Sequence, residues 1–518
     1  MFMELVMRDN FLKTYKRSGA DVNQMIKNAK QGNVEVMYQL GLCYYHGMYG
    51  FPKNNYNASQ WFIKAADAGH MMAQYYAGYC FEKAIGVQHN AYSCAKYYKL
   101  AADQGLMNAQ YEIGYLYEYG IGVEKDETQA AQYFQKATDQ GHGAAACTLG
   151  YYYENGMGVE QDIQKAFSLY QLSAEKNDPC GQCNLGYFYE RGIATEMDKE
   201  KAAYWYLKAA DQGYPRGLSN IAYFYENGIG VEENIPLACT YYQKAVDKNY
   251  PRAQCNLGLF YEKGIGVEKD LVKAIELYKA AADQGDDCAQ CNLGYCYDNG
   301  IGVEIDHKQA NEWFEKSAAQ GFARAQYNLA WNLARGIGAE KDEKRSFELY
   351  EQCANQGYPL GQFGIAYCYH HGRGVAKDIK KAIALYEIIA EKDDSDALCN
   401  LGYIYENEVP EDEIDYNKAF TYYTRSAQLG NGIAICNIGD CYEHGRGVKK
   451  DFRMAVKYYK EAADMDIDIA QYSLGYCYEN GWGIVKDMEK ALEYYHKAAD
   501  HGYEDAIKAL ERLENKDK

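Results

Sequence analysis

Apolar and small residues recur along the chain with a period of 36 or 37 residues. In each period a leucine-like residue is followed by a small residue and, in twelve of the thirteen periods, by an aromatic residue four positions after the first, as in L-G-x-x-Y-E-x-G. The leucine-like residue stands at Leu40, Ala77, Ile113, Leu149, Leu185, Ile221, Leu257, Leu293, Leu329, Ile365, Leu401, Ile438 and Leu474. A fixed period of this length predicts an array of thirteen structural repeats.

Each period predicts two helices joined by a tight loop. In residues 108–141 the first helix, roughly 108–119, places Ala109, Ile113 and Tyr117 on one face at helical spacing. Gly120 ends this helix, because glycine adopts a positive φ without strain. A single pair of helices cannot bury its apolar sides, so successive pairs must stack, and the expected fold class is all-α.

Short-range signals mark the second helix of each pair. Asp126 offers a carboxylate to the free N–H groups at the start of the second helix. The small residue beside the leucine-like position is Gly or Ala in all thirteen repeats, which lets neighbouring helices approach closely. Aspartates at the position of Asp126 recur as Asp162, Asp198, Asp270, Asp306, Asp342, Asp378, Asp451 and Asp487.

The repeated pattern resembles the Sel1-like repeat, as in AQCNLGLFYEKGIGVEKDLVKAIELYKAAADQG at residues 253–285. The resemblance implies a right-handed α/α superhelical solenoid of about thirteen two-helix repeats, related to tetratricopeptide arrays. The resemblance also implies that the protein functions as a protein-binding scaffold, adaptor or assembly factor. We expect an N-terminal capping segment at 1–21, repeats at 22–504, and a C-terminal capping helix and tail at 505–518.

Charge and composition narrow the expected partners to proteins. The chain has 54 Lys and Arg against 73 Asp and Glu, a net charge of −19, which disfavours nucleic acid and anionic membranes. No apolar run approaches the roughly 20 residues needed for membrane insertion. The first twenty residues lack the features of a signal peptide, and the seventeen cysteines do not form a small disulfide-rich frame. We therefore expect a cytoplasmic protein, of unknown oligomeric state, with reduced thiols.

A helical wheel of the first helix separates a stacking side from a second side, formed by positions −5, −1, +2 and +6 relative to the leucine-like residue. The second side is the candidate for a concave groove that binds a peptide or a folded protein. Position −1 is often Asn, which donates and accepts hydrogen bonds, and position −5 is in places Arg, which suits carboxylates. Position +2 is often aromatic, a residue type that is frequent in interface hot spots. Predicted partner-binding residues are Arg216, Asn220, Arg252, Asn256, Asn292, Arg324 and Asn328.

Two alternatives to this groove stay open. The asparagines could bond to the helix of the preceding repeat, and the tyrosines could pack within the solenoid.

One loop departs from the pattern. The repeat at Leu401 replaces its loop with NEVPEDEIDYN (407–417), which lacks both glycines and is strongly acidic. Such a loop is either functional or a tolerated insertion.

Catalytic and metal-binding patterns are weak. Two C-x-x-C elements, Cys180/Cys183 and Cys288/Cys291, lie at the starts of first helices, where the helix dipole lowers a thiol pKa. They lie three repeats apart, too far to share a zinc ion, so packed cysteines are the favoured interpretation. The histidines are scattered, and no nucleophile–base pair or phosphate loop is visible. We predict no cofactor and no enzyme activity; the alternative is a repeat-built enzyme, a thiol oxidoreductase or hydrolase as claimed for some relatives.

Overall fold

The computed structural model describes residues 22–514. This part of the chain contains 28 α-helices, one short 3-10 helix and no β-strand. The chain divides into two compact units, Met1–Lys269 and Asp270–Lys518, which are described separately below. The predicted N-terminal capping segment, residues 1–21, lies outside the described residues.

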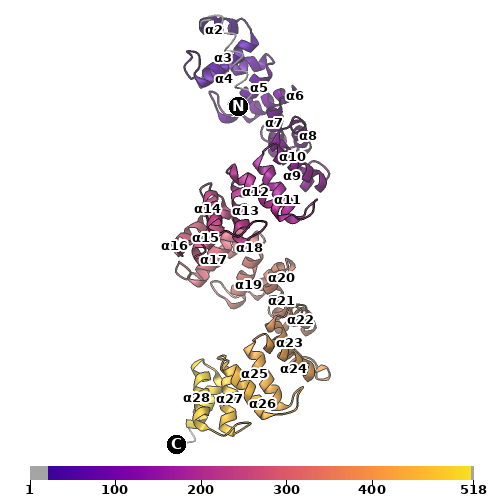
Figure 1. Ribbon diagram of the computed structural model, residues 1–518, viewed down its shortest axis with the longest axis vertical. Coiled ribbons are helices and arrows are strands. Elements are labelled where there is room, and N and C mark those ends of the chain that lie inside the picture. The colour runs from indigo at the N-terminus through magenta and orange to yellow at the C-terminus, as the bar shows by residue number, and fades with distance from the viewer. Residues whose placement is uncertain (1–21, 515–518) are drawn as a thin grey trace. The chain divides into compact units, whose positions relative to one another are not determined.

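In the first unit every described helix packs against the next one along the chain (Figure 1). The first helices of successive repeats also contact each other, as α9 does with α11 and α11 with α13. The helices of this unit are α2 (Val22–Lys30), α3 (Val34–His46), α4 (Asn55–Asp67), α5 (Met71–Lys83), α6 (Ala91–Asp103), α7 (Met107–Tyr119), α8 (Glu127–Asp139), α9 (Gly143–Asn155), α10 (Ile163–Glu175), α11 (Pro179–Arg191), α12 (Lys199–Asp211), α13 (Pro215–Asn227), α14 (Ile235–Val246) and α15 (Pro251–Lys263).

The second unit repeats the same arrangement, with each helix packed on its neighbour in sequence. Its α-helices are α16 (Leu271–Asp283), α17 (Asp287–Asn299), α18 (His307–Ala319), α19 (Ala323–Arg335), α20 (Glu343–Asn355), α21 (Pro359–His371), α22 (Ile379–Ala390), α23 (Ser395–Asn407), α24 (Tyr416–Gln428), α25 (Gly432–His444), α26 (Phe452–Ala463), α27 (Asp468–Asn480), α28 (Met488–Asp500) and α29 (Glu504–Glu514). The 3-10 helix η1, Glu411–Glu413, lies in the acidic loop between α23 and α24.

The helix ends follow the predicted signals. Gly120 ends α7 in the left-handed conformation, with a φ of 68°, and its N–H donates to the carbonyl of Leu116. Asp126 precedes α8, and its carboxylate accepts a hydrogen bond from the N–H of Gln129 at 2.9 Å. All eight further aspartates cap second helices in the same way. The predicted caps are therefore confirmed.

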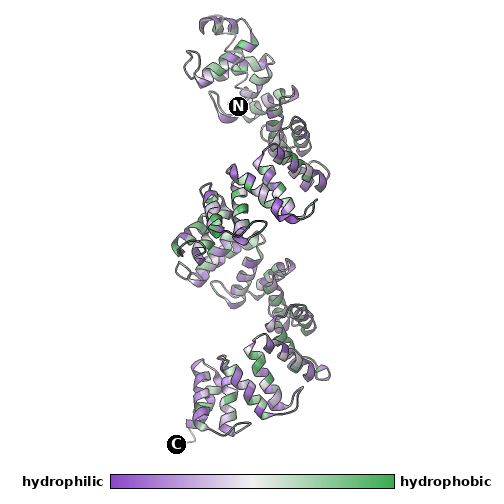
Figure 2. Cartoon of the chain, viewed as in Figure 1, coloured by the Kyte–Doolittle hydropathy of each residue, from purple (hydrophilic) through white to green (hydrophobic). Residues whose placement is uncertain are grey.

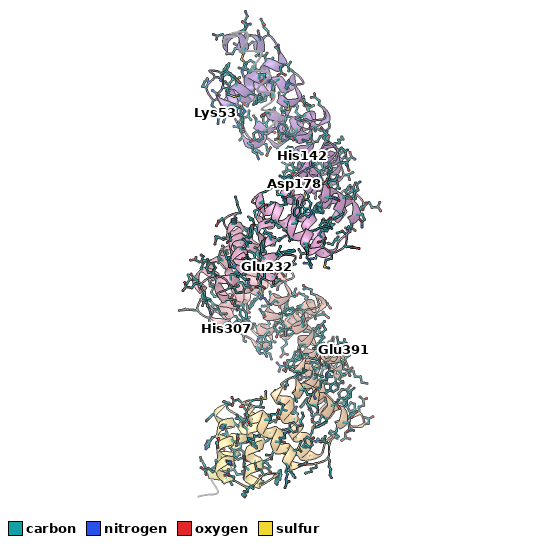
Figure 3. All side chains as sticks on the ribbon, in the orientation of Figure 1. Lys53, His142, Asp178, Glu232, His307 and Glu391 are labelled. Carbon is teal, nitrogen blue, oxygen red and sulfur yellow. The ribbon has the colours of Figure 1, made fainter. Side chains whose placement is uncertain are left out.

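Some first helices also begin with a capping side chain. His142 and Asp178, both labelled in Figure 3, precede α9 and α11. The ring nitrogen Nδ1 of His142 accepts from the N–H of Ala145 at 3.0 Å, and the carboxylate of Asp178 accepts from Gly181 at 2.9 Å. Side-chain acceptors at these positions satisfy N–H groups that have no partner inside the helix.

Within each unit, the core is built from the same kinds of buried side chains in successive repeats. Hydrophilic and hydrophobic residues are interspersed along the helices of each unit (Figure 2). The leucine-like residues are buried in twelve repeats and half-buried at Ile365. At the small position of one repeat, a Cβ on Gly114 would lie only 2.7 Å from the ring of Phe134, which belongs to the second helix of that repeat. The small residue is thus required because an aromatic ring lies directly on the backbone.

A glutamine contact links successive repeats and was not predicted from the sequence. The side-chain amide of Gln140, at the end of α8, donates to Gln110 Oε1 at 2.7 Å and to the carbonyl of Gly105 at 3.0 Å. Gly105 belongs to the end of the preceding repeat, so one amide joins two repeats. The same pairing of glutamines occurs as Gln104–Gln74, Gln212–Gln182, Gln320–Gln290 and Gln356–Gln326.

The last helix, α29, packs against α28 where a closing helix was predicted. It spans Glu504–Glu514 and so begins one residue before the start predicted for the capping helix. The division of the chain into capping segments and repeats stays a prediction. Within residues 22–514 there is no helix with the length and apolar character needed to cross a membrane.

Candidate partner-binding surface

The predicted arginine and asparagine columns meet across repeat boundaries. Arg216 lies in the first turn of α13, and its guanidinium reaches α11 of the preceding repeat. Its Nε donates to Cys183 Sγ at 3.1 Å, and its Nη2 donates to the side-chain oxygen of Asn184. The amide of Asn220, one turn further along α13, also donates to Cys183 Sγ, at 3.6 Å. Arg216 and Asn220 therefore lie together over one cysteine.

The second unit repeats this arrangement at α19. Arg324 Nε donates to Cys291 Sγ at 3.3 Å, and its Nη2 donates to the side-chain oxygen of Asn292. The amide of Asn328 lies 4.0 Å from the same sulfur. The structure thus brings together Arg324, Asn292 and Asn328, and the amide of Asn328 contacts the first helix of the preceding repeat, as in one of the open alternatives.

The remaining predicted pair lies on α15. Arg252 is exposed in the first turn of this helix, and Asn256 is half-buried one turn later. Asn256 lies within hydrogen-bonding reach of Tyr242 on α14. Arg252 and Asn256 occupy the same positions in their repeat as Arg216 and Asn220 do in the preceding one.

Aromatic side chains at position +2 are exposed on first helices of both units. Tyr223 on α13 exposes 46% of its surface and Trp331 on α19 exposes 42%. Tyr367 and Tyr476 in the same column are half-buried. Exposed aromatics at this position are Tyr115, Tyr151, Tyr187 and Tyr223 in the first unit, and Tyr295, Trp331 and Tyr403 in the second. Most of this column is open to a partner rather than packed within the solenoid.

Arginines one turn later cover some of these rings. The guanidinium of Arg335 lies 3.2 Å from the centroid of Trp331, and that of Arg191 lies 5.8 Å from Tyr187. Such contacts hold a large ring in a defined position while leaving its other face accessible. Preorganised aromatic side chains lose little conformational entropy when a partner binds.

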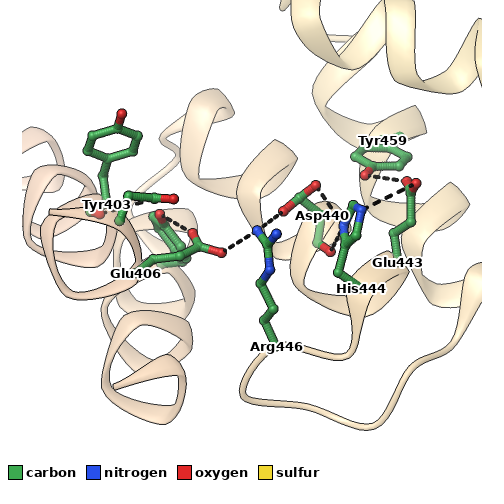
Figure 4. A network of polar contacts seen from close by, with 9 residues as sticks. Tyr403, Glu406, Asp440, Glu443, His444, Arg446 and Tyr459 are labelled. Carbon is green, nitrogen blue, oxygen red and sulfur yellow. Dashed lines mark hydrogen bonds and ion pairs between the residues drawn. The ribbon is translucent and has the colours of Figure 1, made fainter. Parts of the chain in front are cut away.

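The end of α23, from which the acidic loop leaves, is held by the repeat that follows it (Figure 4). Glu406, at the end of α23, is almost fully buried and accepts from Tyr423 at 2.8 Å and from Arg446 Nη1 at 3.0 Å. Arg446 also donates to Asp440 at 3.2 Å, and Asp440 pairs with His444 at 3.0 Å. This network connects the repeat that carries the insertion to the next loop.

The repeat before the insertion holds its other side. Lys377 Nζ donates to Glu408 at 2.8 Å, and His370 Nε2 lies 3.4 Å from the same carboxylate. Burial lowers the pKa of His370 to about 4, so its ring is neutral at physiological pH. Val409 is buried, whereas residues 411–413 are exposed. The insertion is therefore an anchored loop with an exposed acidic tip.

The C-x-x-C element at the start of α11 holds two different thiols. Cys183 is fully buried, and burial raises its pKa to about 11. Cys180 is half-buried, and a hydrogen bond with Cys147 lowers its pKa to about 7. The interpretation as packed cysteines thus holds for Cys183, while the thiol of Cys180 is more acidic than an ordinary cysteine.

The stacked helix pairs with exposed columns on their first helices define an α-helical solenoid. The chain belongs to the Sel1 repeat family. The family pattern "Sel1 repeat" matches residues 34–70, 72–106, 108–142, 143–178, 181–214, 215–250, 251–286, 289–322, 323–358, 359–394, 395–431, 432–467 and 468–503. Proteins built from this repeat generally act as scaffolds for protein interactions and are typically not enzymes.

Solved structures contain similar chains. A protective antigen of uropathogenic Escherichia coli strains that displays an SLR fold is 33% identical, with 82% of this chain and 91% of that chain covered and a TM-score of 0.63. A Sel1 repeat protein from Oxalobacter formigenes is 31% identical over 47% of this chain and 96% of its own, with a TM-score of 0.44. Among curated proteins, none matches the chain.

Proposed function

We propose that the protein is a scaffold or adaptor that holds a peptide or a folded protein on the concave side formed by its first helices. The exposed aromatic column carries this proposal. In the first unit Tyr187 and Tyr223 lie on α11 and α13, which contact each other, so neighbouring repeats offer rings to one partner. Aromatic and arginine side chains supply much of the energy at protein interfaces.

Arginine next to this column supports a partner segment that carries carboxylates. The guanidinium of Arg216 has five N–H donors, and two of its hydrogen bonds are to the preceding repeat. Arg252 and Arg324 are exposed at the equivalent position. The net charge of −19 supports a protein rather than a nucleic acid as the partner, in line with the cytoplasmic role expected from the sequence.

The proposal is tested by capture of proteins from a cell lysate on the immobilised full chain, followed by affinity measurement with each captured partner. The variant Tyr187→Ala with Tyr223→Ala is expected to weaken binding at least about tenfold, because interface aromatics are frequent hot spots. The matched control is Tyr92→Ala with Tyr204→Ala, which removes exposed rings from second helices α6 and α12. Equal binding by both variants would contradict the proposal.

A second pair of variants tests the polar columns. Arg216→Ala with Arg252→Ala, and Asn256→Ala with Asn292→Ala, are each expected to weaken binding by more than about tenfold, since hydrogen bonds to charged groups contribute about 1.5–3 kcal/mol. Melting is measured alongside, because Arg216 also bonds to the preceding repeat. If folded variants bound normally, the polar columns would not belong to the binding surface. The acidic loop, 407–417, would then be tested in the same assay.

A further inference from the structure

Two cysteines on successive first helices lie directly against each other. Cys147 lies in α9 and Cys180 lies in the first turn of α11, and their Sγ atoms are 2.8 Å apart. Cys147 is only 4% exposed, whereas Cys180 is half-buried. The two helices contact each other, so a bond between these sulfurs would join neighbouring repeats. This pair shares Cys180 with the C-x-x-C element, but its second cysteine is Cys147 rather than Cys183.

The two thiols have opposite acid–base character. The Cys147 thiol donates a hydrogen bond to Cys180 Sγ, and this contact lowers the pKa of Cys180 to about 7. The same hydrogen bond, together with burial, raises the pKa of Cys147. The amide of Asn184 donates to Cys147 Sγ at 3.3 Å. Cys180 is therefore suited to attack as a thiolate, and Cys147 to follow as the second thiol.

Spacing favours a disulfide over a metal ion at this position. The ligand atoms of Cys147, Asp178 and Cys180 all lie within 4.8 Å of one another, as a metal site would require. However, a tetrahedral zinc ion with Zn–S bonds of about 2.3 Å holds two sulfurs about 3.8 Å apart. The sulfurs here are 2.8 Å apart, closer to the roughly 2.05 Å of a disulfide bond. The carboxylate of Asp178 is also engaged as the N-cap of α11.

We propose that Cys147 and Cys180 form a reversible disulfide between two repeats by exchange with a low-molecular-weight disulfide. The Cys180 thiolate attacks one sulfur of the small disulfide, which forms a mixed disulfide and releases one small thiolate. The sulfur of Cys147 then attacks the sulfur of Cys180, the bond between Cys180 and the small thiol breaks, and the proton of Cys147 passes to the departing sulfur, which leaves as the second small thiol. Two protein thiols are thereby oxidised to one disulfide, and the small disulfide is reduced to two thiols.

The bond would also act on the polar columns of the proposed surface. Asn184 contacts Cys147 through its amide and accepts from Arg216 through its oxygen. Formation of the disulfide removes the proton from Cys147 and moves its sulfur toward Cys180. Because Asn184 donates to this sulfur, its side chain is expected to move as well, and with it the oxygen that accepts from Arg216. This effect on binding rests on the proposed function, whereas the disulfide itself does not.

The test is thiol mapping on the reduced, folded full chain. The chain is incubated with oxidised glutathione at neutral pH, quenched by acid, alkylated, and digested with trypsin without reduction. Trypsin cuts after Lys136, Lys165, Lys176 and Arg191, so it places Cys147 on peptide 137–165 and both Cys180 and Cys183 on peptide 177–191. The expected product is a cross-link between these two peptides, which disappears after reduction.

Three variants identify the bond. Cys180→Ser and Cys147→Ala are expected to abolish the cross-link, and Cys183→Ser, the matched control in the same peptide, is expected to keep it. Circular dichroism checks that each variant is folded. Cys180 is expected to react more than about tenfold faster than Cys183, because its thiolate fraction at pH 7 is far larger.

Other outcomes would overturn the proposal. A stable glutathione adduct on Cys180 with Cys147 still reduced, or a bridge within peptide 177–191, would show that the two sulfurs do not join. Stoichiometric zinc that blocks alkylation of both thiols would identify a metal site instead. Each of these results is read by mass spectrometry without a binding partner, so failure of the proposed scaffold function would leave them unchanged.

Discussion

Tyrosine–glutamate hydrogen bonds connect the two helices within many repeats. Tyr206 on α12 is fully buried, and its hydroxyl donates to Glu190 on α11 at 2.7 Å. The glutamate is the residue that follows the aromatic position of the first helix, which looks like a surface residue in the repeated pattern. The same bond occurs as Tyr98–Glu82, Tyr170–Glu154, Tyr242–Glu226, Tyr423–Glu406, Tyr459–Glu443 and Tyr495–Glu479. Single side chains therefore contribute polar contacts to an otherwise apolar core.

Removal of one hydroxyl tests this contribution. Tyr206→Phe is expected to lower the free energy of unfolding by about 1.5–3 kcal/mol, because the acceptor Glu190 is charged and largely shielded from water. Tyr204→Phe in the same helix is the control, since its ring is 52% exposed, and it is expected to leave stability within about 0.5 kcal/mol. Urea unfolding followed by circular dichroism gives both values, and equal losses would show that the hydrogen bond is unimportant.

Each second helix depends on a capping side chain at its start. Asp162 precedes α10 and accepts from the N–H of Lys165 at 2.9 Å. Asparagine takes this role in other repeats, where Asn54, Asn90 and Asn234 accept from the backbone in the same way. The requirement is therefore a short side chain with an oxygen acceptor, and a negative charge is not essential.

Substitution of the cap separates these two properties. Asp162→Ala is expected to cost about 1 kcal/mol, because an N–H group at the start of α10 loses its partner. Asp162→Asn keeps the oxygen and is expected to change stability by only a few tenths of a kcal/mol. The measurement is thermal melting of both variants beside the wild type. An asparagine variant as unstable as the alanine variant would show that the charge, rather than the acceptor, is what matters.

Contacts between sequence neighbours build each unit. Every described helix packs on the next within its unit, so the stability of each unit is expected to be close to a sum over neighbouring interfaces. The residues at the start of two successive repeats are identical, Tyr214-Pro215-Arg216 and Tyr250-Pro251-Arg252. A whole repeat can therefore be removed without a change of residue types at the junction.

Deletion of residues 215–250 tests this description. The shortened chain is expected to stay folded, with the same helicity per residue by circular dichroism, because Pro251 then follows Tyr214 as Pro215 did. Deletion of 215–232 alone is the control: it leaves α14 without its partner helix and is expected to reduce helicity per residue and melting temperature. If both deletions were tolerated equally, or both unfolded the chain, the repeat would not be the structural unit.

The sequence by itself determined the repeat number, the helix pairs and their ends. These features depend on contacts within one repeat, such as Gly120 at the end of α7 and Asp126 before α8, and short-range signals of this kind are readable from spacing. Thirteen copies of one pattern reinforce each signal. The exposed aromatic column was also readable, because a helical wheel separates its positions from the stacking side.

Only the tertiary structure decided which side chains meet between repeats. Position −5 of one repeat lies on position −2 of the repeat before it, so Arg216 contacts Cys183, and Cys180 contacts Cys147, across 33 residues of sequence. This pairing depends on the angle and offset at which two first helices stack. A 36-residue period specifies that repeats follow one another but contains no information on that offset, because the stacking geometry results from the packing of all side chains at the interface.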